Sequence, residues 1–178
     1  MTFTKIWCLS ILKIKNRHFL KSGDVKTLQK NIQELFPSSN QLFGKRDKIE
    51  KGNMEDGTTL YFINGELVLF EIGGRLVPFL RVLLKNLILL PKVTIDTGGV
   101  PYIANGADVM LPGIVAVDMG IEKDDYVVVV DENHNKALAV GLSLLDEGEL
   151  SSKKKGKGVK NLHYVGDRYW TEFLKLSK

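Results

Sequence analysis

A chain of 178 residues, 44% hydrophobic and 26% charged, is long enough for one or two folded domains and has the composition of neither a disordered nor a fibrous protein. Its single cysteine, Cys8, cannot form an internal disulfide, which predicts an intracellular, cytoplasmic protein. No group of Cys and His residues has the spacing of metal ligands, so neither a metal nor a cofactor is expected. The longest apolar runs, such as residues 87–90, fall far short of the roughly 18 residues that a membrane-spanning helix needs.

The apolar stretch at residues 6–12 has the character of a weak signal sequence. Basic residues follow it at positions 13, 15 and 17, and no small-residue cleavage site is present. We therefore expect the stretch to pack as a strand, or residues 1–12 to be an extension from an upstream start codon.

An amphipathic helix is predicted next. Ser22 or Asp24 is suited to cap it, and Pro37 ends it. Its apolar face consists of Val25, Leu28, Ile32, Leu35 and Phe36. Residues 38–56 are polar and predict a loop with one short strand near Ile49.

A β-hairpin follows this loop. Its strands are predicted at residues 59–63 and 66–72, and Asn64-Gly65 between them suits the positive φ angles of a type I′ turn. Pro78 is predicted in the first turn of a short helix, where its missing N–H costs nothing. Pro91-Lys92 is then a natural domain boundary.

The boundary divides an α+β domain, residues 1–91, from a second domain, residues 92–178. Short strands with frequent turn signals predict a small β-barrel in the second domain. Its expected strands are 93–95, 126–130, 137–145, 162–165 and 169–174, of which the second and third pair across a loop at 131–135. Residues 151–159 are too rich in Gly and Lys for a core element. Residues 100–107 have apolar residues at helical spacing, but Asn105-Gly106 is typical of a hairpin turn. The residues alone therefore leave both a helix and a hairpin open for this segment.

Four glycines, Gly98, Gly99, Gly106 and Gly113, bracket a short apolar strand at residues 107–110. Glycine lets the main chain approach a ligand closely or adopt a positive φ. It also punctuates ordinary loops, so spacing alone leaves two interpretations open, a binding surface built from backbone and a set of common turns.

Residues 98–114, GGVPYIANGADVMLPGI, resemble the signature of the PUA domain, the small RNA-binding β-barrel of pseudouridine synthases and archaeosine transglycosylases. Later segments agree with that family at residues 124–129, 139–142, 156–159 and 161–164, with Asp167 and Trp170. Before residue 92, segments 18–20, 64–70 and 78–85 resemble the stand-alone archaeal PUA proteins, whose eukaryotic relatives are the malignant-T-cell-amplified-sequence proteins and the front of ligatin. The resemblance covers residues 17–178.

This resemblance implies a C-terminal PUA-type barrel, a helix at residues 100–107, and binding of structured RNA in translation initiation or ribosome recycling. The implied targets are the tRNA acceptor end and small-subunit rRNA. The implied groove residues are Gly98, Gly99, Gly106, Ala107, Met110, Leu111, Pro112 and Gly113. Asp108 would repel phosphate, so a structural role in capping a turn is expected for it. Tyr164 and Trp170 are expected in the core rather than stacked on bases.

Charge is divided unevenly along the chain. Residues 1–92 carry 15 Lys and Arg against 8 Asp and Glu, a net charge of +7, whereas residues 93–178 carry 10 against 13, a net charge of −3. An acidic barrel that binds RNA must gather its cations locally, as the lysines of 153–160 do, although such a run alone is more typical of a solvated loop. The expected phosphate contacts are Arg75, Arg81 and Lys92 near the domain junction, and Lys153, Lys154 and Lys157.

No feature of the sequence predicts catalysis or a small-molecule substrate. It contains no phosphate-binding loop and no nucleophile elbow, and the paired acids Asp124-Asp125 and Asp146-Glu147 would point to opposite faces of a strand. A binding protein is therefore predicted rather than an enzyme. Two alternatives stay open: a protein-interaction subunit that targets a catalytic or ribosomal partner to RNA, and an accessory factor in RNA modification.

Overall fold

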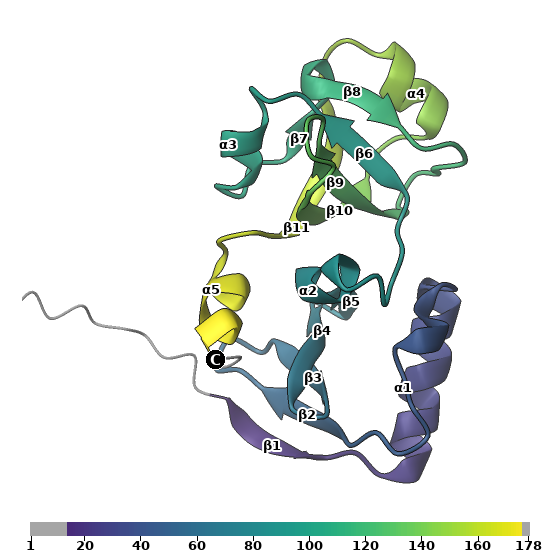
Figure 1. Cartoon of the computed structure of the whole chain (residues 1–178), viewed down its shortest axis with the longest axis vertical. Helices are drawn as coiled ribbons and strands as arrows, with labels where there is room; N and C mark the ends of the chain where they lie inside the picture. The colour runs from purple at the N-terminus through teal and green to yellow at the C-terminus, as the bar shows by residue number, and fades with distance from the viewer. Residues whose placement is uncertain (1–13, 176–178) are drawn as a thin grey trace, which may run out of the picture.

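The computed structural model describes residues 14–175, and its strands form two sheets arranged along the long axis of the molecule (Figure 1). The first sheet is antiparallel and contains, in spatial order, β1 (Lys15–Phe19), β2 (Ile49–Asn53), β3 (Thr59–Ile63), β4 (Glu66–Ile72) and β5 (Arg75–Pro78). Its helical segments are α1 (Ser22–Leu35), η1 (Ser39–Gln41) and α2 (Leu80–Leu84). The predicted strand at residues 6–12 lies outside the described residues.

The hairpin of β3 and β4 is the centre of the first sheet. Asn64 and Gly65 have φ angles of 52° and 84°, as the predicted turn requires. The side chains at the middle of the two strands form the first hydrophobic core, which includes Leu60, Phe62, Leu69 and Phe70. The short strand predicted near Ile49 is also confirmed, as β2.

Helix α1 packs one apolar face into the same core. Its buried residues are Leu28 and Ile32, with Phe36 directly after the helix, whereas Leu35 is exposed. The predicted side-chain cap at Ser22 or Asp24 is wrong, because the helix starts after Lys21 and no side chain accepts a hydrogen bond there. Asp24 instead lies in the first helical turn, where its carboxylate interacts favourably with the helix dipole.

The second sheet curls into a nearly closed barrel. Its strands, in spatial order, are β7 (Val109–Met110), β11 (Lys157–Tyr164), β10 (Ala137–Ser143), β9 (Tyr126–Asp131), β6 (Lys92–Ile95) and β8 (Ile114–Val117). Only β6 and β9 pair in parallel. The edge strands β7 and β8 are separated in the chain only by η2 (Leu111–Gly113), so the two edges of the sheet meet. The expected pair of β9 and β10 is confirmed.

The end of the chain forms a helix, α5 (Arg168–Lys175), and the strand predicted at 169–174 is wrong. Tyr169 and Phe173 are both buried, and their spacing of four residues places them on one face of a helix. Asp167 starts this helix, because its Oδ1 accepts a hydrogen bond from the Trp170 backbone N at 2.7 Å.

Two further predictions need correction. Pro78 ends β5 instead of starting a helix, since β5 is an edge strand in which a missing N–H is tolerated, and α2 begins at Leu80.

The Gly- and Lys-rich segment predicted at residues 151–159 is shorter in the structure. Helix α4 (Glu147–Ser152), capped by Asp146, precedes it and β11 starts at Lys157, so only residues 153–156 lack regular structure.

The chain crosses from β11 of the barrel to helix α5, which lies beside the first sheet (Figure 1). Tyr169 and Phe173 of α5 share one hydrophobic core with the first sheet and with barrel residues of β9 and β10. Tyr169 stacks on Phe70 of β4, with ring centroids 4.5 Å apart. His163 of β11 is fully buried, contacts the rings of Phe70 and Phe79, and places its Nδ1 2.6 Å from Asp167 Oδ2. The two sheets therefore share an aromatic interface that holds the barrel in place.

Candidate nucleic-acid interface

A groove of about 600 Å³ runs across the barrel between helix α3 (Val100–Ile103) and the strand β7. It combines backbone from the turn after β6 with residues of α3, β7 and η2. Of the positions predicted from the sequence, it brings together Gly98, Gly99, Ala107, Met110, Pro112, Gly113 and Lys157. Six of the eight residues expected to line a groove thus share one surface, and the expected helix at 100–107 is present as the shorter α3.

Asp96 organises the backbone of this groove. Its Oδ1 accepts a hydrogen bond from the Gly99 N at 2.7 Å, and its own backbone N donates to the Gly113 carbonyl at 2.9 Å. One residue therefore ties the turn before α3 to the end of η2. A Cβ at Gly98 would meet only Asp96 Oδ1, at 3.4 Å, so the groove is open at this position.

Two large apolar side chains on the groove are exposed to solvent. Tyr102 is 70% exposed and Met110 is 48% exposed, and both line the groove. Such side chains offer flat and polarisable surfaces to a nucleobase. Tyr102 was not among the predicted contacts. The helical spacing that buries Ile103 in the barrel leaves Tyr102 off the packed face, and this signal was available in the sequence.

Lys157 forms an ion pair with Asp108 at the rim of the groove, with Nζ and Oδ2 2.8 Å apart. Asp108 also accepts a hydrogen bond from the Asn161 backbone N at 2.9 Å. The hydrogen bond from Lys157 holds the pKa of Asp108 below its ordinary value, so the carboxylate stays charged. Asp108 thus has a structural role, but it fastens β11 to the segment before β7 instead of capping a turn.

Two other predicted positions lie behind the groove. Leu111 is buried in the barrel core. Gly106 has a φ of 87°, and a Cβ on it would stand 2.8 Å from the ring of Tyr164, so it packs on this half-buried tyrosine. Trp170 is also half-buried, beside Phe79, and its expected packing role agrees with this contact. Leu111 and Gly106 therefore belong to the packing of the barrel, whereas Trp170 packs at the interface with the first domain.

The remaining basic positions lie around the groove or away from it. Lys153 forms an ion pair with Glu149, and with Lys154 it lines a small hollow beside β8 that shares Pro112 with the groove. Lys92 begins β6 and does not line the groove. Arg75 lies in a separate cleft between the two sheets, and Arg81 is on α2. Only Lys157 among the six predicted cations is in the groove lining.

Within residues 14–175 there is no group of three or more His, Cys, Asp or Glu side chains placed to hold a metal ion. The same part of the chain contains no helix long and apolar enough to cross a membrane.

Two family models match the chain. A pre-PUA-like domain matches residues 11–86, and a PUA domain matches residues 91–165. An uncharacterized protein of Methanocaldococcus jannaschii is 38% identical over 159 residues, which cover 89% of this chain and 98% of that protein. Translation machinery-associated protein 20 of Schizosaccharomyces pombe is 31% identical over 170 residues, covering 90% of this chain and 94% of the relative.

A solved structure has the same arrangement of both domains. The crystal structure of a hypothetical protein from Pyrococcus horikoshii aligns with a TM-score of 0.76 at 29% identity, covering 88% of this chain and 99% of that one. The similarity to these proteins therefore extends over nearly the whole of both chains and is not confined to the barrel.

Proposed function

Because the chain belongs to the family of pre-PUA and PUA domain proteins that includes translation machinery-associated protein 20 and the malignant T-cell-amplified sequence proteins, we propose that it binds structured RNA in translation. The targets we propose are the acceptor end of tRNA and small-subunit rRNA, reached in initiation or ribosome recycling. The protein acts by binding and not by catalysis.

The observation that carries this proposal is the composition of the groove. Its floor is main chain from the turn at Gly98-Gly99 and from Gly113, which admits sugar and phosphate at close range. Tyr102 and Met110 present exposed apolar surface beside that floor. Contacts of this kind recognise the shape of a nucleic acid and the face of an unpaired base. A folded RNA with a free single-stranded end offers both.

The groove itself is not strongly basic, because Asp96 and Asp108 line it together with Lys157. Phosphate attraction must come from its surroundings, and Lys153 and Lys154 beyond Pro112 supply cations next to it. The positive charge of residues 1–92 adds a broader attraction. We therefore propose that the groove positions the RNA end while lysines around it bind the flanking phosphates.

The proposal is tested by titrating the purified chain with total tRNA, tRNA lacking its 3′ CCA, and purified small ribosomal subunits over a range of salt concentrations. Preference for intact tRNA or for the subunit would support the proposal and identify the target. Weak binding to all three that moderate salt abolishes would contradict it, and would favour the alternative of a subunit that reaches RNA through a protein partner.

Changing Lys153, Lys154 and Lys157 together to Glu should weaken RNA binding and reduce its dependence on salt. Each lost phosphate contact lowers the slope of log affinity against log salt by about 0.7 to 0.9, so the slope should fall by about 2 to 3. A matched control changes Lys26, Lys123 and Lys136, which are exposed and lie outside the groove. If both triple variants lose affinity equally, the effect is one of net charge, and the 153–157 segment is not part of the site.

A further inference from the structure

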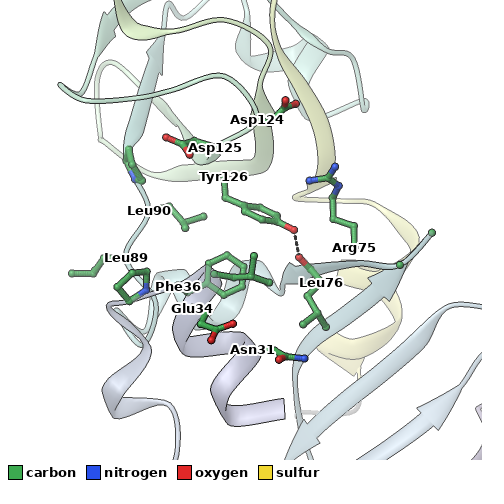
Figure 2. Close-up of a pocket in the computed structure, with 15 residues that line it drawn as sticks. Asn31, Glu34, Phe36, Arg75, Leu76, Leu89, Leu90, Asp124, Asp125 and Tyr126 are labelled. Atoms are coloured by element: carbon green, nitrogen blue, oxygen red, sulfur yellow. Dashed lines mark hydrogen bonds between the residues drawn. The ribbon is translucent and has the colours of Figure 1, made fainter. Parts of the chain in front are cut away.

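A second cleft, of about 780 Å³, lies between the two domains and is separate from the groove. It is formed by the end of α1, the turn between β4 and β5, the connection at residues 89–91, and the start of β9. Tyr126 stands at its centre: its ring contacts Phe36 edge-on at 5.0 Å, and its hydroxyl donates to the Leu76 carbonyl at 2.5 Å (Figure 2). These contacts join the domains, so the cleft has a fixed floor.

Two leucines of this cleft have exposed side chains. Leu89 is 61% exposed and Leu35 is 46% exposed, and both line the cleft. Leu89 is held in this position by its own backbone, because its N donates to the Ser38 hydroxyl at 2.8 Å and its carbonyl accepts from that hydroxyl at 3.0 Å. Apolar side chains fixed in a concave surface are typical of an interaction site.

The charged groups of the cleft are mainly acidic. Figure 2 shows Asp124 and Asp125 on one side of Tyr126 and Glu34 on the other, and Arg75 is the single cation among the lining residues. Glu34 stands in the last turn of α1, where its charge adds to the negative end of the helix dipole, and Lys30 one turn earlier is its ion-pair partner, with Nζ and Oε1 3.7 Å apart. Both side chains of this pair are largely exposed, so the pair is weak, and the end of α1 still favours a ligand cation beside Glu34.

We propose that this cleft binds a segment of a partner protein in which an apolar side chain lies next to a lysine or arginine. The apolar side chain would pack on Leu35 and Leu89, and the cation would interact with Glu34, Asp124 and Asp125. RNA is a poor occupant, because three carboxylates repel phosphate. Glu34 and Arg75 come from residues 1–92, which carry a net charge of +7, whereas Asp124 and Asp125 come from the net-acidic residues 93–178. Carboxylates outnumber cations three to one among the lining residues, which favours a basic ligand.

The test is a selection of random peptides displayed on phage against the full chain, followed by fluorescence anisotropy of the enriched peptides. The expected peptides pair an apolar residue with Lys or Arg. Leu89→Glu and Glu34→Lys, each at an exposed position, should weaken their binding at least about fivefold. The matched controls are Leu84→Glu, at a side chain that is 50% exposed outside the cleft, and Glu55→Lys, and both should leave binding unchanged.

The proposal is overturned if no peptide is enriched, if the enriched peptides are acidic, or if Leu89→Glu weakens binding no more than Leu84→Glu does. It is independent of the RNA proposal, and the same variants separate the two. Leu89→Glu and Glu34→Lys should change the affinity for tRNA no more than their charge-matched controls Leu84→Glu and Glu55→Lys do. Substitution of the groove residue Gly98 should leave peptide binding intact.

Discussion

Gly98→Glu is expected to weaken tRNA binding about 30-fold, equivalent to about 2 kcal/mol. A Cβ at this position meets only Asp96 Oδ1, at 3.4 Å, so the backbone has room for a side chain here. It adds a third carboxylate to the groove, beside Asp96 and Asp108, at the point where main chain would meet phosphate. Filter binding or anisotropy at fixed salt measures the loss.

Gly98→Gln is the matched control for this variant, because it has the same size and no charge. It should cost less affinity than Gly98→Glu, and the difference between the two measures repulsion of phosphate. Equal binding by the wild-type chain and the Glu variant would mean that RNA does not approach the turn at Gly98-Gly99.

Asp167→Ala is expected to lower the free energy of unfolding by about 3 kcal/mol. The Asp167 carboxylate is almost fully buried and has three partners: the Trp170 N at 2.7 Å, the His163 Nδ1 at 2.6 Å and the Tyr164 N at 3.3 Å. Its loss leaves two backbone donors and a buried imidazole unsatisfied, and it removes the start of α5. Urea denaturation followed by circular dichroism measures the change.

His163 makes this substitution more costly than the loss of a helix cap. Its Nε2 already has no hydrogen-bond partner among the described residues, so without Asp167 both ring nitrogens would be unpaired. Asp146→Ala is the control, because Asp146 caps α4 through the Glu149 N at the surface and should cost about 1 kcal/mol. If Asp167→Ala costs no more than Asp146→Ala, the His163 pair contributes nothing to the interface of the two domains.

The sequence predicted correctly those elements whose structure depends mainly on residues adjacent in the chain. The Asn64-Gly65 turn is one such element, because the two residues suit the turn wherever the hairpin packs. Helix α5 shows the limit of this approach. Alternation of Tyr169, Thr171 and Phe173 suggested a strand, but the buried pair Tyr169 and Phe173 faces the first sheet, which the local sequence does not reveal. Asp167, three residues before Trp170, was the cap signal that favoured a helix.

The same distinction applies to the two concave surfaces. The groove is built from residues 95–113 and Lys157, so most of it could be predicted from one continuous motif. The cleft combines four segments that are distant in the sequence, around residues 34, 75, 90 and 125, and only the packing of the two domains brings them together. Arg75 illustrates the consequence: it was predicted as an RNA contact near the junction, and the structure places it in the acidic cleft.

The most direct test of RNA binding in the groove is the change in backbone amide NMR signals when a tRNA acceptor-stem RNA is added to the isotopically labelled chain. We predict the largest changes at Gly98, Gly99, Ala107 and Gly113, with smaller changes at residues 153–157. The Gly98→Glu variant should show reduced changes under the same conditions. Changes that avoid residues 98–113, or that centre on the cleft around Tyr126, would contradict the assignment of the groove as the RNA site.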